Sequence, residues 1–251
     1  MRALLIVLAL LASSSALAGP AILHTVTGWS PARITGSYFV AWREPAYGVT
    51  LNGANVSAWA SRFPATSTVV QGTAGAQPAW SSSGGPNSRA SISFAAGGRY
   101  FDDESIANDT ADLYSVQVIK RDGAIVAYQN VYEQTATLGK PQFWYQADGD
   151  IEANSPSGVV SVPGTGWTLV EIISTDATHR TQMWVNGSSV GDSTGAAAFT
   201  IPNPLAITRF NRAGASTFKG IISGEIFMGR APTATEQSLI QQYFRIRYNL
   251  W

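Results

Sequence analysis

The chain has 251 residues, and its 16 basic and 16 acidic side chains give a formal net charge of zero. This balance argues against a nucleic-acid-binding protein, which would carry a basic surface, and against a polybasic membrane-binding patch. The absence of cysteine excludes disulfide bonds, zinc–thiolate sites and a cysteine nucleophile. With 45% hydrophobic residues, the chain is long enough for one large all-β domain with a sizeable core.

Residues 1–18 have the three-part layout of a secretory signal peptide. Arg2 supplies a minimal positive start, residues 3–12 form an apolar run, and Ala16-Leu17-Ala18 is a small-residue cleavage site. The apolar run is about half of what a membrane-spanning helix needs, so we expect cleavage after Ala18 rather than a retained anchor. The prediction is a secreted protein, extracellular or periplasmic, whose mature chain is one domain over residues 19–251.

In the first two thirds of the chain, most segments with regular patterning alternate polar and apolar residues, which predicts strands. An exception is 55–61, where Val56 and Trp59 lie three residues apart and indicate a short helical turn. Residues 72–88 are rich in Gly, Ser, Ala and Pro and are interpreted as a surface loop or irregular crossover. The strands predicted in this part cover 37–43, 89–94, 113–120, 124–130 and 142–147.

The last third predicts further strands that lead directly into one helix at 233–248. Asn186-Gly187 is the strongest two-residue hairpin signal in the chain. Thr233 followed by Glu236 forms a capping box, which marks the start of the helix. An apolar stripe at helical spacing (Leu239, Ile240, Tyr243, Phe244) indicates packing against the sheet edge. The strands predicted here cover 167–175, 180–186, 197–201, 205–209 and 218–227, and the fold class is an all-β, two-sheet antiparallel sandwich with one C-terminal helix.

Three stretches carry a resemblance to a known family: 48–61 with 65–80, then 166–191, then 218–250. In this order they resemble the opening, the paired strands around Asn186-Gly187, and the closing strand and helix of concanavalin A-like lectin/glucanase superfamily domains, also called LamG-like jelly rolls. The resemblance implies a jelly-roll sandwich. It leaves function open, because the superfamily includes lectins, glycosidases, polysaccharide lyases and structural modules.

Asp148, Asp150 and Glu152 are the candidate catalytic residues. On a strand these positions would share one face, and the resemblance implies that glucanases use such a strand, with one carboxylate as nucleophile and another as acid. Because Gly149 favours a turn, the preferred interpretation is a solvated acidic turn between strands at 142–146 and 158–162.

Asp102, Asp103 and Glu104 are candidate metal ligands, since carboxylate oxygens suit calcium and calcium is common in the resembled superfamily. Their spacing matches no calcium-binding loop, so the preferred interpretation is a polar loop.

Glycan binding would require aromatic rings beside polar loops. The candidate ligand-binding residues are Trp144, Tyr128, Tyr132, Asn211 and Arg212. For the aromatic residues among them, packing in the core is the preferred interpretation, because tryptophan and tyrosine are largely buried on average.

The sequence therefore predicts a secreted lectin-like module that binds glycans or another surface target without catalysis. One alternative is a polysaccharide-cleaving glucanase or lyase that uses the acidic cluster. A second alternative is a structural module of an envelope, appendage or virion. The expected partner is a carbohydrate or surface glycan, with no nucleic acid and no stable membrane insertion after signal removal, and calcium is the candidate cofactor.

Overall fold

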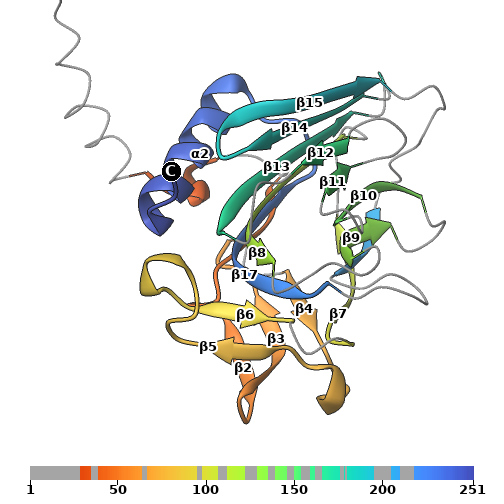
Figure 1. Cartoon of the computed structure of the whole chain (residues 1–251). Coiled ribbons are helices and arrows are strands. Elements are labelled where there is room, and N and C mark those ends of the chain that lie inside the picture. The colour runs from red at the N-terminus through yellow and green to blue at the C-terminus, as the bar shows by residue number, and fades with distance from the viewer. Residues whose placement is uncertain are drawn as a thin grey trace, which may run out of the picture.

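The computed structural model describes residues 29–34, 39–63, 67–94, 98–106, 112–121, 129–134, 139–145, 150–153, 159–161, 166–175, 178, 180–194, 205–209 and 218–251. The predicted signal peptide, and the predicted strand at 197–201, lie outside these residues. Most of the described segments are strands, and α2 (Ala234–Tyr248) is the single α-helix among them (Figure 1).

The strands form two antiparallel sheets. The larger sheet has the order β15-β14-β13-β8-β17-β6-β5-β3-β2, with β1 paired to β17 and β4 paired to β3. Its strands are β1 (Phe39–Arg43), β2 (Val49–Asn52), β3 (Asn55–Ala60), β4 (Thr68–Val70), β5 (Ala79–Ser81), β6 (Ser91–Ser93), β8 (Asp112–Arg121), β13 (Thr168–Thr175), β14 (Arg180–Val185), β15 (Ser188–Thr194) and β17 (Gly220–Met228).

The smaller sheet has the order β12-β11-β10-β9-β16-β7. Its strands are β7 (Phe101–Ile106), β9 (Gln129–Gln134), β10 (Gly139–Tyr145), β11 (Asp150–Ala153), β12 (Val159–Ser161) and β16 (Leu205–Arg209). Three short 3₁₀ turns complete the described elements: η1 (Pro31–Arg33), η2 (Ala74–Ala76) and η3 (Pro86–Ser88). The predicted all-β sandwich with a C-terminal helix is confirmed.

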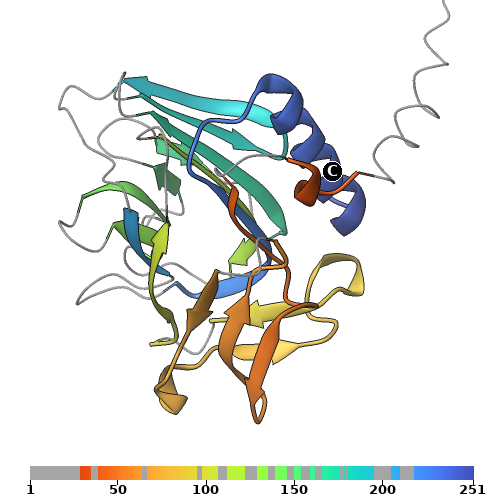
Figure 2. The ribbon, with the colours of Figure 1, turned by 180° about the vertical axis from the view of Figure 1, so that it is seen from behind.

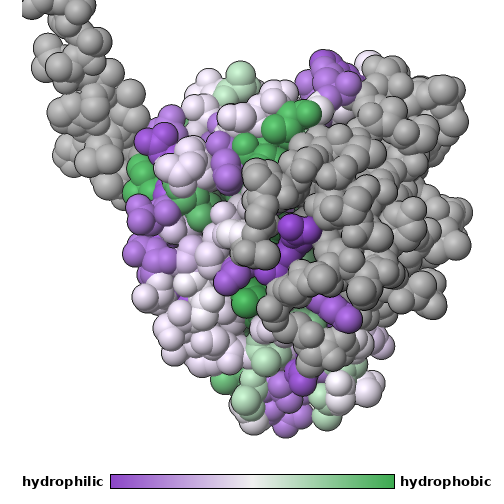
Figure 3. All heavy atoms as spheres, in the orientation of Figure 1, coloured by the Kyte–Doolittle hydropathy of each residue, from purple (hydrophilic) through white to green (hydrophobic). Residues whose placement is uncertain are grey.

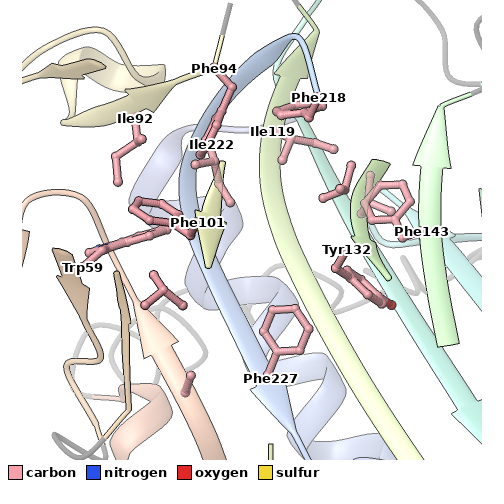
Figure 4. Close-up of a cluster of buried hydrophobic side chains, with 14 of the residues drawn as sticks. Trp59, Ile92, Phe94, Phe101, Ile119, Tyr132, Phe143, Phe218, Ile222 and Phe227 are labelled. Atoms are coloured by element: carbon pink, nitrogen blue, oxygen red, sulfur yellow. The ribbon is translucent and has the colours of Figure 1, made fainter. Parts of the chain in front are cut away.

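The main hydrophobic core lies between the two sheets. Tyr132 and Phe143 of the smaller sheet face Ile119 and Phe227 of the larger one (Figure 4). The Tyr132 and Phe227 rings meet edge to face, with their centroids 5.4 Å apart. The Tyr132 hydroxyl is hydrogen bonded to Ser115 at 2.8 Å, which satisfies a polar group that would otherwise be buried without a partner.

A second core covers the opposite face of the larger sheet. Because side chains alternate along a strand, Tyr114, Val116 and Val118 of β8 point away from the smaller sheet and pack against α2. The sheet therefore has two buried faces, and Figures 1 and 2 show α2 on one side of β13–β15 and the smaller sheet on the other. This arrangement explains why β8 and β13 are buried almost continuously rather than at every second residue.

The helix begins where the sequence predicts. The Thr233 side chain accepts a hydrogen bond from the Glu236 amide, and the Glu236 carboxylate accepts one from the Thr233 amide at 2.8 Å. Arg230 adds an ion pair to the same carboxylate, with Nη2 and Oε1 2.6 Å apart. The buried residues of α2 are Ile240, Tyr243, Phe244 and Tyr248, so the stripe covers the face of the sheet rather than its edge and extends one turn further than predicted.

The hairpin at Asn186-Gly187 is confirmed. Asn186 has φ 51° and Gly187 has φ 77°, the left-handed pair that a tight turn between β14 and β15 requires. The Asn186 side chain also accepts a hydrogen bond from the Leu169 amide at 3.0 Å, which holds the turn against β13.

The predicted helical turn at 55–61 is wrong, because these residues form β3. Val56 and Trp59 are both fully buried although they lie three residues apart. The register explains this spacing: Leu51 pairs with Val56 while Thr50 pairs with Ala58, so β3 contains one extra residue, a β-bulge. A bulge brings side chains of odd spacing to the same face, which in sequence resembles a helical period. Within the predicted loop 72–88, the structure forms η2, β5 and η3.

On the face shown in Figure 3, hydrophilic side chains gather in several groups over the described part, with smaller hydrophobic groups between them. Within that part, α2 is neither long nor apolar enough to be a candidate membrane span.

Candidate functional site

The candidate site lies where one edge of β17 passes from one partner strand to another. Ile221 and Ile222 pair with β6, whereas residues from Glu225 onward pair with β1. The register shifts between these two regions, at Ser223. The chain that leaves β1 and the chain that enters β6 therefore meet beside Ser223 and enclose a pocket between them.

This pocket, called the Trp80 pocket below, has a volume of about 340 Å³. Figures 1 and 2 show the loop between β5 and β6, which forms one of its walls, beside the C-terminal end of α2. The residues that line it include side chains from the segment after β1, from β5 and its loop, from β17 and from the last turn of α2: Glu44, Trp80, Ser82, Ser88, Arg89, Ser223, Arg247 and Tyr248.

Glu44 is a buried carboxylate surrounded by donors. Its Oε2 accepts from Arg62 Nη1 at 2.7 Å and from Arg247 Nη2 at 2.6 Å, and its Oε1 accepts from the Tyr243 hydroxyl at 2.7 Å. Burial by itself would lower the pKa of Arg247, but the charge of Glu44 raises it above its ordinary value. Burial, together with the same carboxylate, raises the pKa of the Tyr243 hydroxyl. Glu44 therefore ties α2 to the end of β1.

Arg89 is held by two contacts. Its Nε donates to the main-chain oxygen of Arg247 at 2.6 Å, and its guanidinium carbon lies 5.9 Å from the centroid of the Tyr248 ring. That ring is itself fixed, because the Tyr248 hydroxyl donates to the main-chain oxygen of Ser223. Among the described residues, no carboxylate forms an ion pair with Arg89.

Trp80 forms the aromatic wall. Its indole nitrogen donates to the main-chain oxygen of Pro45 at 2.8 Å, so the orientation of the ring is set by the segment after β1. The side chain is half-buried, which leaves part of the ring at the pocket.

The loop from β5 to β6 is closely fitted to β17. A Cβ on Gly85 would lie 2.2 Å from the Ser223 hydroxyl oxygen, so this position requires glycine. Asn87 and Ser88 both have left-handed backbone conformations, with φ 54° and 53°. Consecutive non-glycine residues in this region carry strain, which tends to occur at functional sites.

Two of the three acidic candidates for catalysis, Asp150 and Glu152, lie elsewhere, in the smaller sheet. Asp150 and Glu152 belong to β11, which pairs with β10 on one side and β12 on the other, so the preferred interpretation as a turn is wrong for these two residues. The inference of a turn rested on Gly149, but the strand begins directly after this residue and is held by two neighbours. Asp148 lies outside the described residues, and the catalytic role remains a prediction.

The candidate metal ligands Asp102, Asp103 and Glu104 lie in β7, not in the polar loop that was preferred for them. These residues form a strand because they pair with β16, where Glu104 lies opposite Ile207. The side chains of these three residues lie outside the described part, so their role as metal ligands remains a prediction. Among the side chains that the structure does describe, no group of three or more His, Asp or Glu residues could hold a metal ion.

Two of the predicted ligand-binding residues, Tyr132 and Trp144, lie on neighbouring strands of the smaller sheet, β9 and β10. Tyr132 is fully buried between the sheets, in agreement with the core packing preferred for the aromatic candidates. The backbone of Trp144 lies in β10, opposite Asn130 of β9 and Glu152 of β11. Tyr128, Asn211 and Arg212 lie outside the described residues.

The Trp80 pocket was not predicted from the sequence. One local feature could have indicated a binding site here, namely a tryptophan at the start of a Ser/Gly-rich segment. Such a segment places polar groups beside an aromatic ring. No local signal connects this segment with Glu44 or Arg247, which are distant in sequence.

A second hollow of about 350 Å³ lies between the β14–β15 turn and the outer side of α2. Amide and hydroxyl side chains line it together with Arg245 and Trp251, and it contains no acidic residue among those described.

No family model matches the sequence, and no curated protein is significantly similar to it. Solved structures are similar in fold. Trypanosoma rangeli sialidase matches 85% of this chain and 34% of its own, with a TM-score of 0.53 and 10% identity. The binding domain of Paraclostridial Mosquitocidal Protein 1 matches over 83% of this chain and 52% of its own, with a TM-score of 0.54 and 10% identity.

A third similar structure is of botulinum neurotoxin type C, whose cell entry is described as dependent on interaction with two ganglioside molecules. The match covers 82% of this chain and 51% of the toxin chain, with a TM-score of 0.51 and 7% identity. The chain thus spans about a third of the sialidase and half of the two toxin chains. At these identities the likeness shows a shared β-sandwich fold.

Proposed function

We propose that this protein is a secreted, lectin-like module of the concanavalin A-like jelly-roll class that binds glycans without cleaving them, and that the Trp80 pocket is its binding site. The observation that carries the proposal is the pairing of a partly exposed, oriented indole ring with fixed polar groups in one pocket. The similar fold of a toxin that interacts with gangliosides supports the proposal.

The chemistry of the pocket suits a sugar ring. One face of a pyranose carries C–H groups that pack on an aromatic ring, while its hydroxyls need hydrogen-bonding partners. Trp80 provides the ring, and the hydroxyls of Ser82 and Ser88 lie at the same pocket. The volume of about 340 Å³ falls in the range of small-molecule sites.

The same pocket does not favour glycoside hydrolysis. That reaction normally requires two carboxyl groups on opposite sides of the scissile bond. Glu44 is the single carboxylate among the described residues that line the pocket, and its oxygens are bound by two arginines and a tyrosine. A cleaving activity would have to use other residues, with Asp150 and Glu152 of β11 as the candidates.

The test is a glycan array followed by titration calorimetry on the best-bound glycan. We expect Trp80→Ala to weaken binding about tenfold or more, because aromatic anchors in pockets carry much of the binding energy. Trp80→Phe keeps an aromatic face, so it should retain part of the affinity even where the alanine variant is unstable.

Trp251→Ala is the matched control, because Trp251 is an exposed tryptophan at the second hollow. If Trp251→Ala lost binding and Trp80→Ala kept it, the binding site would be in the second hollow and not in the Trp80 pocket. A blank array would contradict the proposal, and release of new reducing ends from a bound polysaccharide would favour the enzyme.

A further inference from the structure

We infer that the glycan bound in the Trp80 pocket is an acidic saccharide, whose carboxylate group is held by the guanidinium of Arg89. The inference rests on the proposed function, since it names the class of ligand for that same pocket.

Arg89 presents an unused donor edge. Its Nε is occupied by the main-chain oxygen of Arg247 at 2.6 Å, whereas its two Nη atoms form no hydrogen bond with the described residues. Arg89 is half-buried and lines the pocket, so this edge belongs to the pocket rather than to an open surface. A half-buried charge is costly to leave without a partner, and a ligand anion would supply one.

The nearby carboxylate cannot serve as that partner. Both oxygens of Glu44 are engaged by Arg62, Arg247 and Tyr243. Arg62 and Arg247 both pair with Glu44, and Arg89 lines the same pocket, where Glu44 is the single carboxylate among the described lining residues, so positive charge is in excess there. A neutral sugar would leave the excess in place, whereas a negatively charged sugar would balance part of it.

The geometry favours a carboxylate. Two neighbouring N–H groups of a guanidinium match the two coplanar oxygens of a carboxylate in a bidentate pair. The hydrogen bond to Arg247 and the Tyr248 ring fix the guanidinium before a ligand arrives, so little side-chain entropy is lost on binding. Trp80 then packs on the sugar ring while Arg89 binds the acid group.

The experiment compares three probes by titration calorimetry: a glucuronate-containing oligosaccharide, the same oligosaccharide after reduction of its carboxyl groups to alcohols, and the reduced form after sulfation. We expect the carboxylate form to bind about tenfold or more tightly than the reduced form, because charge-assisted hydrogen bonds are stronger than neutral ones. The preference should weaken as salt concentration rises.

In Arg89→Gln the preference for the carboxylate form should disappear, while weak binding of the reduced form persists through Trp80. Arg89→Lys keeps the charge but not the bidentate edge, so it should keep only part of the preference. Arg245→Gln is the control, because it removes an equal charge at the second hollow. Its affinities for all three probes should equal those of the unmodified protein. The comparison of the three probes on the unmodified protein needs no variant and stands even if Arg89→Gln does not fold.

Equal affinity for the carboxylate and reduced forms would overturn the inference and leave the proposed function intact. Equal binding of the carboxylate and sulfated forms would confirm an anion site but overturn the carboxylate assignment. Absence of binding to any saccharide, including the neutral members of the array, would overturn both.

Discussion

Glu171 is a carboxyl group enclosed between β13 and α2. It is fully buried, and its Oε2 accepts hydrogen bonds from the Tyr114 hydroxyl at 2.7 Å and from Gln237 at 3.4 Å. Burial raises the pKa of Glu171 from 4.5 to about 7, and the hydrogen bonds limit the rise. The native state therefore keeps a proton on Glu171 between about pH 4.5 and pH 7, where the unfolded chain has already released it.

This proton gives a prediction at the scale of one residue. Because the native state binds the proton more tightly, the free energy of unfolding should fall as pH rises from about 4.5 to 7, by an amount on the order of 3 kcal/mol. Glu171→Gln is neutral at every pH and keeps an acceptor for Tyr114, so its unfolding free energy should depend less on pH over this interval. Urea unfolding at pH 5, 6, 7 and 8 measures the difference.

Glu236→Gln serves as the control for this experiment. The hydrogen bond from Arg230 lowers the pKa of Glu236, so that carboxyl titrates below the tested interval. The variant should shift stability by a similar amount at each of the four pH values. If Glu171→Gln showed the same pH slope as the unmodified protein, the raised pKa of Glu171 would be wrong.

At the scale of elements, the position of α2 depends on a missing side chain in β17. Gly224 lies under the helix, and a Cβ at this position would be 2.8 Å from the Tyr248 hydroxyl oxygen and 3.0 Å from a ring carbon of Phe244. Both rings belong to the buried stripe of α2 and are stacked with their centroids 5.8 Å apart. The close approach also lets Tyr248 reach Ser223 and thereby forms the floor of the Trp80 pocket.

Gly224→Ala should therefore displace the last turns of α2. We expect a loss of about 1–3 kcal/mol of unfolding free energy, because a methyl group is forced into a packed interface. Gly75→Ala is the control, since a Cβ there would meet no atom within 4 Å, and its effect should be close to zero. Thermal and urea unfolding of both variants provide the measurement, and equal stabilities would show that the helix can move at no cost.

At the scale of the whole molecule, the larger sheet is covered on both faces. The smaller sheet lies on one side, and α2 with Trp29 and Ile34 lies on the other. The buried ion pair of Arg43 and Glu225, 2.7 Å apart, joins β1 to β17 on the face that points to the smaller sheet. Trp29 and Ile34, from the first described segment of the chain, thus contribute to the fold.

The chain-level prediction concerns maturation. When the full chain is expressed in a bacterium with its own first 18 residues, we expect export and removal of 1–18, because these residues combine a charged start, an apolar run and a small-residue cleavage site. Mass spectrometry of the exported protein should find Gly19 at the N-terminus. Ala16→Leu and Ala18→Leu should block processing, and an exported protein that retained Met1 would contradict the prediction.

Much of the fold could be predicted because its signals are local. The alternation in β8, the Asn186-Gly187 turn and the Thr233–Glu236 capping box each involve residues within one element. Predictions failed where long-range pairing decides the structure. The bulge in β3 depends on its register with β2, and β11 is a strand because β10 and β12 lie on both of its sides.

The sequence by itself determined the fold class, the main hairpin and the position of the helix, because hydrophobic period, turn conformation and helix capping act between neighbouring residues. Only the tertiary structure decided where a ligand could be held. The Trp80 pocket exists because β17 changes partner at Ser223, which brings Glu44, Arg89 and Arg247 together from distant parts of the chain.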